Sequence, residues 1–192
     1  MSKGTVEQDD AESYDRYYDA VFGGPAVRVR PGECYVSTDP GEMVVTVLGS
    51  CVAACVRDPL TGLGGMNHFM LAESDSGEWG GVSHAMRYGN HAMERLINAI
   101  LRTGCPRNRL EIKLFGASSL GVGGGRVGQA NADFVRRYVA HEGLSVAAAD
   151  LGGDQPRRIH YFPKDGRVKR LLLNPAEQAA VRTGETAYRR RC

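Results

Sequence analysis

The sequence predicts an α+β domain in which strands outnumber helices. Short apolar runs rich in β-branched residues recur along the chain, and turn residues such as Gly, Pro and Asp separate them. Two segments show apolar residues at the three- and four-residue spacing of an amphipathic helix. An order that is mostly β with two inserted helices favours the α+β class. The length of 192 residues suits one globular domain.

The expected strands start near residue 26 and end near residue 173. Residues 43–48 are β-branched and apolar, which is typical of a buried strand, and Gly49 ends this run before Cys51 resumes it. The turn signal at 58–62 predicts a hairpin with the segment that follows. The full set of expected strands is 26–36 with a turn at Pro31-Gly32, 43–48, 51–56, 63–71, 110–115, 144–149, 158–162 and 168–173.

Two helices are expected within this series of strands. The first is predicted from an N-cap at Asn90 to a stop at Gly104, and the second over 131–141. The apolar stripe of the first helix is Met93, Leu96, Ile97, Ile100 and Leu101.

A Gly-rich loop is expected at 116–128, between the strand at 110–115 and the second helix. Residues 123–128 match the pattern G-x-G-x-x-G of dinucleotide-binding turns. In that fold the glycines directly follow the strand, whereas here seven residues intervene. We therefore interpret the loop as a lid or as a partner-contacting segment.

Charge divides the chain into a core domain and two ends. Residues 1–26 form an expected flexible acidic arm, with six acids against two bases in 1–19, and its aromatic residues suit docking as a helix. Residues 27–175 form the expected domain. Residues 176–192 form an expected basic tail, since 164–192 holds eight bases against three acids.

The composition excludes several classes of protein. A net charge of +2 argues against a dedicated nucleic-acid binder. No run of about 18 apolar residues is present, so membrane insertion is not expected. The acidic start is unlike a secretory signal, which makes the cytoplasm the expected location and thiols the expected state of the five cysteines.

Cys51 is the cysteine whose surroundings suit a nucleophile. It follows Gly49 and Ser50 where the strand breaks, and a broken strand offers backbone N–H groups to an oxyanion. Cys51 and His68 lie at similar distances from the turn at 58–62, so antiparallel pairing is expected to bring this nucleophile and base together. The open alternatives are a buried structural cysteine and a core histidine with satisfied hydrogen bonds.

Metal binding is the competing use of these side chains. Alternation along a strand places Cys51 and Cys55 on one face but about 13 Å apart, which is too far for one zinc ion. Neither His68 nor His84 completes a recognised ligand spacing with them. No metal and no organic cofactor is expected.

Five motifs in register resemble the CheD family of chemoreceptor glutamine deamidases. They are LGSC at 48–51, GMNHFML at 65–71, RYG at 87–89, KLFG at 113–116 and DLGG at 150–153. The resemblance spans about three-quarters of the chain. It implies a three-layer α/β/β sandwich similar to the catalytic domains of deamidating bacterial toxins.

The resemblance also implies an activity and its residues. The family hydrolyses glutamine side chains on the cytoplasmic domains of chemoreceptors to glutamate and ammonia. Its nucleophile corresponds to Cys51, its base to His68, and its third catalytic residue to Thr46. Association with a CheC-type phosphatase is a further implied partner. The alternatives are an adaptor or regulator of such a phosphatase that performs no catalysis, and a cysteine hydrolase acting on another amide.

Overall fold

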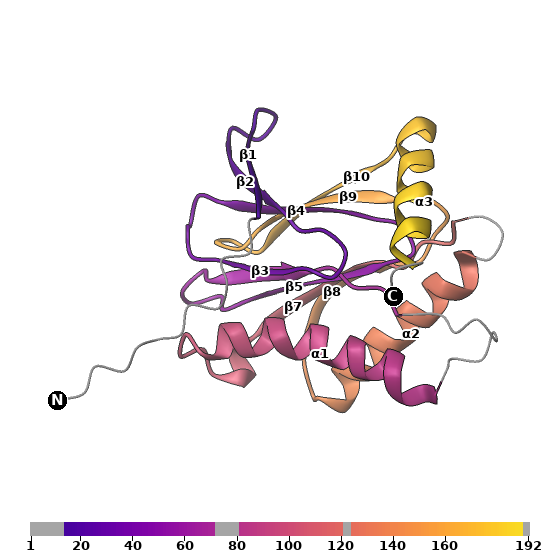
Figure 1. The fold of residues 1–192 in the computed structure, drawn as a ribbon. Helices are drawn as coiled ribbons and strands as arrows, with labels where there is room; N and C mark the ends of the chain where they lie inside the picture. Colours follow the sequence, from indigo (N-terminus) through magenta and orange to yellow (C-terminus); the bar gives the residue numbers. More distant parts are fainter. Residues whose placement is uncertain (1–13, 72–80, 121–123, 190–192) are drawn as a thin grey trace.

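The structure, a computed structural model, describes residues 14–71, 81–120 and 124–189. Two five-stranded sheets lie face to face, and two helices cover the outer side of one sheet (Figure 1). The first sheet has the order β1 (Asp15–Asp19), β2 (Gly24–Arg28), β4 (Met43–Leu48), β9 (Arg157–Phe162) and β10 (Arg167–Leu172). The second sheet has the order β3 (Cys34–Ser37), β6 (Gly64–Asn67), β5 (Val52–Arg57), β7 (Glu111–Gly116) and β8 (Val146–Leu151).

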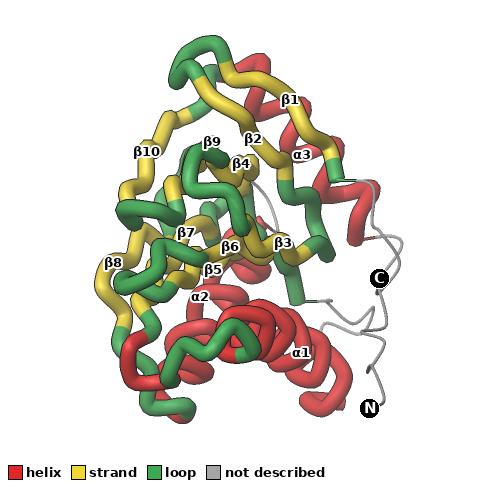
Figure 2. Tube along the Cα trace, turned by 90° about the vertical axis from the view of Figure 1, so that its left-hand side faces the viewer, coloured by secondary structure: helices red, strands yellow, loops and turns green. Residues whose placement is uncertain are grey.

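The helices and the sheets form an α/β/β arrangement. Figure 2 shows α1 (Gly81–Leu101) and α2 (Gly124–His141) on one side of the second sheet and the first sheet on the other side. The third helix, α3 (Pro175–Arg189), stands across one end of the two sheets (Figure 1). A short 3₁₀ turn, Arg107–Arg109, precedes β7. The expected α+β class and the three-layer sandwich are therefore confirmed.

Two apolar cores hold these layers together. The second sheet packs against α1 and α2 through Phe69, Ile112 and Leu114 on its outer face. Its inner face packs against the first sheet, where Val44 and Tyr161 lie. Because β5 lies in the middle of the second sheet, it is buried on both faces, which explains its uninterrupted apolar sequence.

The predicted strands are confirmed, with shifts of one or a few residues at their ends. The hairpin at 58–62 joins β5 to β6 as an antiparallel pair, with Cys55 opposite Met66. The predicted run from 43 to 56 is divided between the two sheets, which the sequence pattern did not indicate. Its two halves, β4 and β5, lie in different sheets, and residues 49–51 carry the chain from one sheet to the other.

Both predicted helices exist, but each begins earlier than expected. The predicted N-cap Asn90 lies inside α1, nine residues after its start at Gly81. The expected loop at 116–128 gives way to α2 at Gly124, while 121–123 lie outside the described residues. Gly128 lies within this helix, and a side chain is excluded there because a Cβ would lie 2.7 Å from the carbonyl oxygens of Ala117 and Ser118. Close packing, and not a loop conformation, explains this glycine.

The two ends of the domain are more ordered than the charge pattern predicts. Within the expected arm, residues 15–19 form β1, a strand and not a docked helix, which pairs antiparallel with β2. The expected basic tail forms α3. The Asn174 side chain accepts a hydrogen bond from the Glu177 N–H at 3.0 Å, and Glu177 accepts one from the Asn174 N–H at 3.1 Å. This reciprocal capping starts the helix where composition predicts a tail.

Candidate active site

Residues 49–51 cross from one sheet to the other with their carbonyl groups fixed. The Ala117 N–H donates to the Cys51 carbonyl and the Ser118 N–H to the Gly49 carbonyl, each at 2.7 Å. The Asn131 side chain, which lies on α2, donates to the Ser50 carbonyl at 2.9 Å. All three carbonyls of this crossover therefore accept hydrogen bonds, two from the loop that follows β7 and one from α2.

The three N–H groups of the same crossover converge on one carboxylate. Glu185 Oε1 accepts from Gly49 N at 3.1 Å and from Cys51 N at 3.3 Å. Glu185 Oε2 accepts from Ser50 N at 3.1 Å and from Ser50 Oγ at 2.6 Å. Consecutive backbone N–H groups that point to one place form an anion-binding concavity, which we call the 49–51 nest.

Cys51 and His68 lie on the same face of the second sheet. Val52 and Phe69 form an antiparallel bridge with two hydrogen bonds of 2.9 Å, in register with the β5–β6 pair. Cys51 and His68 each precede one of these bridge residues, so both side chains point toward the first sheet. Such diagonal neighbours have Cβ atoms about 7 Å apart. The expected pairing of Cys51 and His68 across antiparallel strands agrees with this register.

Thr46, on β4, reaches His68 across the space between the two sheets. Its Oγ1 lies 2.8 Å from His68 Nδ1 and 2.7 Å from the Val29 carbonyl oxygen. A carbonyl only accepts hydrogen bonds, so the single hydroxyl proton of Thr46 goes to Val29 and Oγ1 accepts from His68 Nδ1–H. This hydrogen-bond network assigns the neutral tautomer and leaves a lone pair on Nε2.

The site is closed to solvent. Cys51 is 0% exposed and His68 is 2% exposed. Burial lowers the pKa of His68 from 6.5 to about 4, and the negative charge of Glu185 acts in the opposite direction. His68 Nε2 is buried and has no hydrogen-bond partner among the described residues. The ring is thus neutral at pH 7, with its basic nitrogen unoccupied.

The other described cysteines have different surroundings. Burial raises the pKa of Cys55, whose side chain packs in the core between the sheets. Burial also raises the pKa of Cys105, which lies in the core beneath the helices. Cys34 is buried in the same core. Cys51 differs from these three cysteines because its own backbone N–H belongs to the 49–51 nest.

The structure adds three residues that sequence reasoning did not assign to the site. Asn131 was predicted to open a helix, but it is buried and connects the Ser50 carbonyl to the Leu71 N–H. Gly116 has a φ of 111°, and a Cβ there would lie 2.1 Å from the Cys51 carbonyl oxygen. Glu185 was counted only as one of the acids in a basic segment. The KLFG motif offered a signal for Gly116; no local pattern marks the other two.

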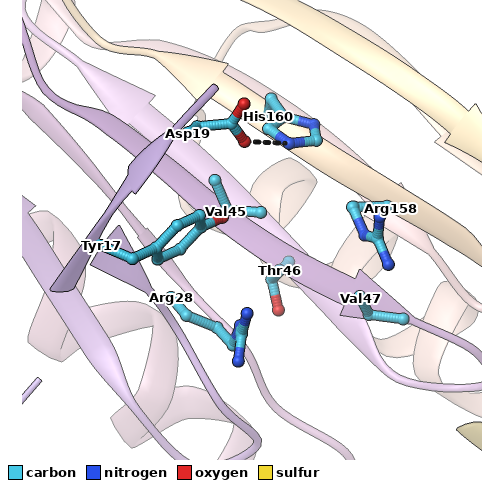
Figure 3. Close-up of a pocket in the computed structure, with 8 residues that line it drawn as sticks. All are labelled: Tyr17, Asp19, Arg28, Val45, Thr46, Val47, Arg158 and His160. Atoms are coloured by element: carbon cyan, nitrogen blue, oxygen red, sulfur yellow. Dashed lines mark ion pairs between the residues drawn. The ribbon is translucent and has the colours of Figure 1, made fainter. Parts of the chain in front are cut away.

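A pocket of about 490 Å³ opens on the outer face of the first sheet, and Figure 3 shows the eight residues that line it. Asp19 Oδ2 and His160 Nε2 pair there at 3.2 Å. The pocket lies on β4, the strand that also carries Thr46. Successive side chains of a strand point to opposite faces, so the Val45 side chain faces the pocket whereas the Thr46 hydroxyl faces His68. The pocket therefore lies on the far side of β4 from Cys51 and His68.

Among the described residues, no helix combines the length and the hydrophobicity needed to cross a bilayer. A solved structure of a Neisseria meningitidis protein aligns with 73% of this chain and 63% of its own chain, at 12% identity and a TM-score of 0.41. That similarity is too weak to support an argument.

Sequence comparisons are far more specific. The family model described as "CheD chemotactic sensory transduction" matches residues 70–170. A relative from Rhodopseudomonas palustris, named "Probable chemoreceptor glutamine deamidase CheD", is 53% identical over 98% of this chain and 88% of its own length. Proteins with the same name from Saccharophagus degradans and Ralstonia pickettii are 49% and 45% identical, over 90% and 98% of this chain and 82% and 80% of their own lengths. The chain therefore belongs to the CheD family.

Proposed function

We propose that this chain hydrolyses the side-chain amide of glutamine residues on the cytoplasmic domains of chemoreceptors, giving glutamate and ammonia. The names of the relatives support the substrate. The observation that most supports the chemistry is the β5–β6 register, which puts Cys51 and His68 on one face while Thr46 binds His68 Nδ1. The proposed location is the cytoplasm, where these receptor domains lie.

In the proposed reaction Cys51 is the nucleophile and His68 is the base. Nε2 of His68 takes the thiol proton, and the sulfur attacks the glutamine Cδ. The C–N bond then breaks, and the protonated ring gives its proton to the departing ammonia. A water molecule, deprotonated by the same nitrogen, hydrolyses the thioester, which releases glutamate and restores the thiol. Thr46 orients the ring and keeps the proton on Nδ1.

The oxyanion formed during attack requires donors beside Cys51. The N–H groups of the 49–51 nest supply them, and their carbonyls are fixed by Ala117, Ser118 and Asn131, so the donors are preorganised. Removing a single such donor in cysteine or serine hydrolases typically costs about a hundredfold in rate. No step in this scheme needs a metal ion or an organic cofactor.

The Cys51→Ala variant tests the proposal. Purified protein is incubated with a chemoreceptor cytoplasmic domain, and conversion of glutamine to glutamate is followed by peptide mass spectrometry. We expect the rate to fall about a thousandfold or more, because the nucleophile is lost. Cys55→Ala is the matched control and is expected to retain most of the rate. Undiminished conversion by folded Cys51→Ala protein would overturn the assignment.

The same variant separates this proposal from the two alternatives. An adaptor or regulator of a CheC-type phosphatase would keep its effect on chemotaxis when Cys51 is replaced by Ala, whereas a deamidase would lose it. A hydrolase for another amide would need Cys51 but would leave chemoreceptor glutamines unchanged in the mass spectrum.

A further inference from the structure

Helix α3 buries a carboxylate where a docking helix ordinarily buries apolar side chains. Among its described side chains only Glu185 is buried, at 7% exposure. Gln178, Val181 and Tyr188 lie on the same helical face and are only partly buried. The four hydrogen bonds to the Glu185 carboxylate come from neutral donors, all of them in residues 49–51. Burying a charge in this way rarely adds stability, so a functional reason is worth seeking.

The position of the carboxylate matches a position in the proposed reaction. When a cysteine attacks an amide, the carbonyl oxygen moves into the site formed by backbone N–H groups beside the sulfur. Glu185 Oε1 already occupies that site, bound to Cys51 N and Gly49 N. A Cβ on Gly49 would lie 2.6 Å from the same oxygen, so this glycine makes room for it.

We propose that α3 occupies the substrate's place, with the Glu185 carboxylate held as the product of the reaction would be held, so that the site works only after α3 has moved away. This inference rests on the proposed function, because it assigns the 49–51 nest to the oxyanion. It adds to the proposed function a segment of the same chain that occupies the site, and a step in which this segment leaves before the reaction.

The closed site agrees with a resting state. Cys51 and His68 are shielded from solvent, and burial holds the pKa of His68 far below the range in which a general base works well near pH 7. Departure of α3 frees the 49–51 nest for the substrate. It also removes Glu185, whose negative charge raises the pKa of His68.

The attachment of α3 suits a reversible contact. Outside the nest, the partly buried Tyr188 packs against the core between the sheets, and its hydroxyl lies 2.8 Å from the Tyr88 hydroxyl. Glu177 pairs with Arg158 at 3.2 Å. The two polar contacts each contribute about 1 kcal/mol or less. A competing segment with similar chemistry can therefore replace the helix.

The sharpest test turns α3 into a substrate. In the Glu185→Gln variant the enzyme itself carries an amide at the reacting position. When α3 opens far enough to admit water, Cys51 attacks this amide, ammonia leaves, and water hydrolyses the thioester to a carboxylate. We expect intact mass and peptide mapping to show conversion at position 185 at a rate that does not depend on protein concentration. Gln178, on the same helix, is the internal control and is expected to remain an amide.

The outcomes separate the inference from the function on which it rests. Conversion that disappears when Cys51→Ala is added supports the inference, whereas conversion that persists is spontaneous and overturns it. If position 185 stays an amide while the wild-type protein deamidates a chemoreceptor, the inference fails and the proposed function stands. If neither reaction occurs, both fail.

A second measurement does not depend on turnover. Glu185→Ala is expected to release α3 and to raise the rate at which iodoacetamide alkylates Cys51 by about tenfold, as when an open form of about 10% population becomes dominant. The receptor deamidation rate should rise with it. Thr186→Ala alters the adjacent, exposed position and is expected to leave both rates unchanged. Equal alkylation in the wild-type and Glu185→Ala proteins would overturn the inference.

Discussion

Helices α1 and α3 are both amphipathic, but they are attached to the molecule in different ways. α1 buries Met93, Leu96, Ile97 and Ile100 at 0–1% exposure between the second sheet and α2. α3 buries Glu185 and leaves most of its other side chains at the surface. Apolar burial contributes about 25 cal/mol per Å². Hydrogen bonds to a carboxylate contribute about 1.5–3 kcal/mol each, but the cost of burying the charge offsets much of this gain. α1 is therefore an integral part of the core, whereas α3 is attached largely through one buried carboxylate, as the proposed reversible attachment requires.

The same contrast runs through the site. Cys51 and His68 are fixed by the register of β5 and β6, which lie between two apolar cores. The donors of the 49–51 nest are fixed by Ala117, Ser118 and Asn131. The carboxylate that occupies the nest comes from α3. The proposed reacting groups are thus held by the two sheets, whereas the carboxylate beside them comes from a helix whose other described side chains are exposed or only partly buried.

The largest expected effect is on the stability that α1 provides. Ile97→Ala should lower the free energy of unfolding by about 2–5 kcal/mol, because it leaves a cavity in the core beneath the helices. Val181→Ala removes an aliphatic side chain from α3 and should cost less than about 1 kcal/mol. Denaturant titrations of both variants measure the difference. Similar losses would show that α3 is as much a part of the fold as α1.

The next effect is a pH dependence of stability that comes from His68. Its pKa in the folded protein is about 4, below the ordinary 6.5, so between these values the unfolded chain binds a proton that the folded chain does not. The contribution of His68 to the free energy of unfolding should therefore be at its maximum above about pH 6.5. It should fall by up to about 3 kcal/mol as the pH drops to 4. His68→Gln should lose this part of the slope. Urea titrations at several pH values measure this dependence. If the free energy of unfolding changes with pH equally in the two proteins, the assignment is contradicted.

Patterns of short range predicted the rigid half of this comparison. The β-branched run at 43–48 matches β4, and the turn at 58–62 sets the hairpin that places Cys51 and His68 on one face. The stripe from Met93 to Leu101 predicts α1. The first turns of this helix were not predicted, because no apolar periodicity continues before Asn90. These features are predictable because each depends on residues close together in sequence.

The reversible half could not be predicted in the same way. The nest and its carboxylate lie 136 residues apart, from Gly49 to Glu185, and an acid within a basic segment resembles part of a solvated tail. Asn131 is similar, since its amide joins Ser50 and Leu71 from a helix far along the chain. Contacts of this range become visible only when the layers are stacked. The resemblance to a family supplied the roles of Cys51 and His68, but the motifs that carry it end at residue 153, before α3.

A smaller effect is expected from Thr46, which positions His68 from the first sheet. Thr46→Val removes the hydroxyl that binds Nδ1 while keeping the shape of the side chain. We expect kcat/KM for receptor deamidation to fall about tenfold, the equivalent of 1.4 kcal/mol, because the ring loses its orientation and its tautomer preference. Thr46→Ser should restore most of the rate, and the pH profile of Thr46→Val should shift. An unchanged profile would mean that Thr46 only packs.

The smallest effect concerns the attachment of α3 itself. Tyr188→Phe removes the hydroxyl that lies 2.8 Å from the Tyr88 hydroxyl and leaves the ring in place. Losing this contact, worth about 0.5–1 kcal/mol, should raise the population without α3 and hence the alkylation of Cys51 by two- to fivefold. Tyr18→Phe changes an exposed tyrosine on β1 in the same way and should leave the rate unchanged. An increase for Tyr188→Phe smaller than that for Glu185→Ala would rank the nest as the stronger attachment. A larger increase for Tyr188→Phe than for Glu185→Ala would mean that Tyr188 contributes more than the nest to the attachment of α3.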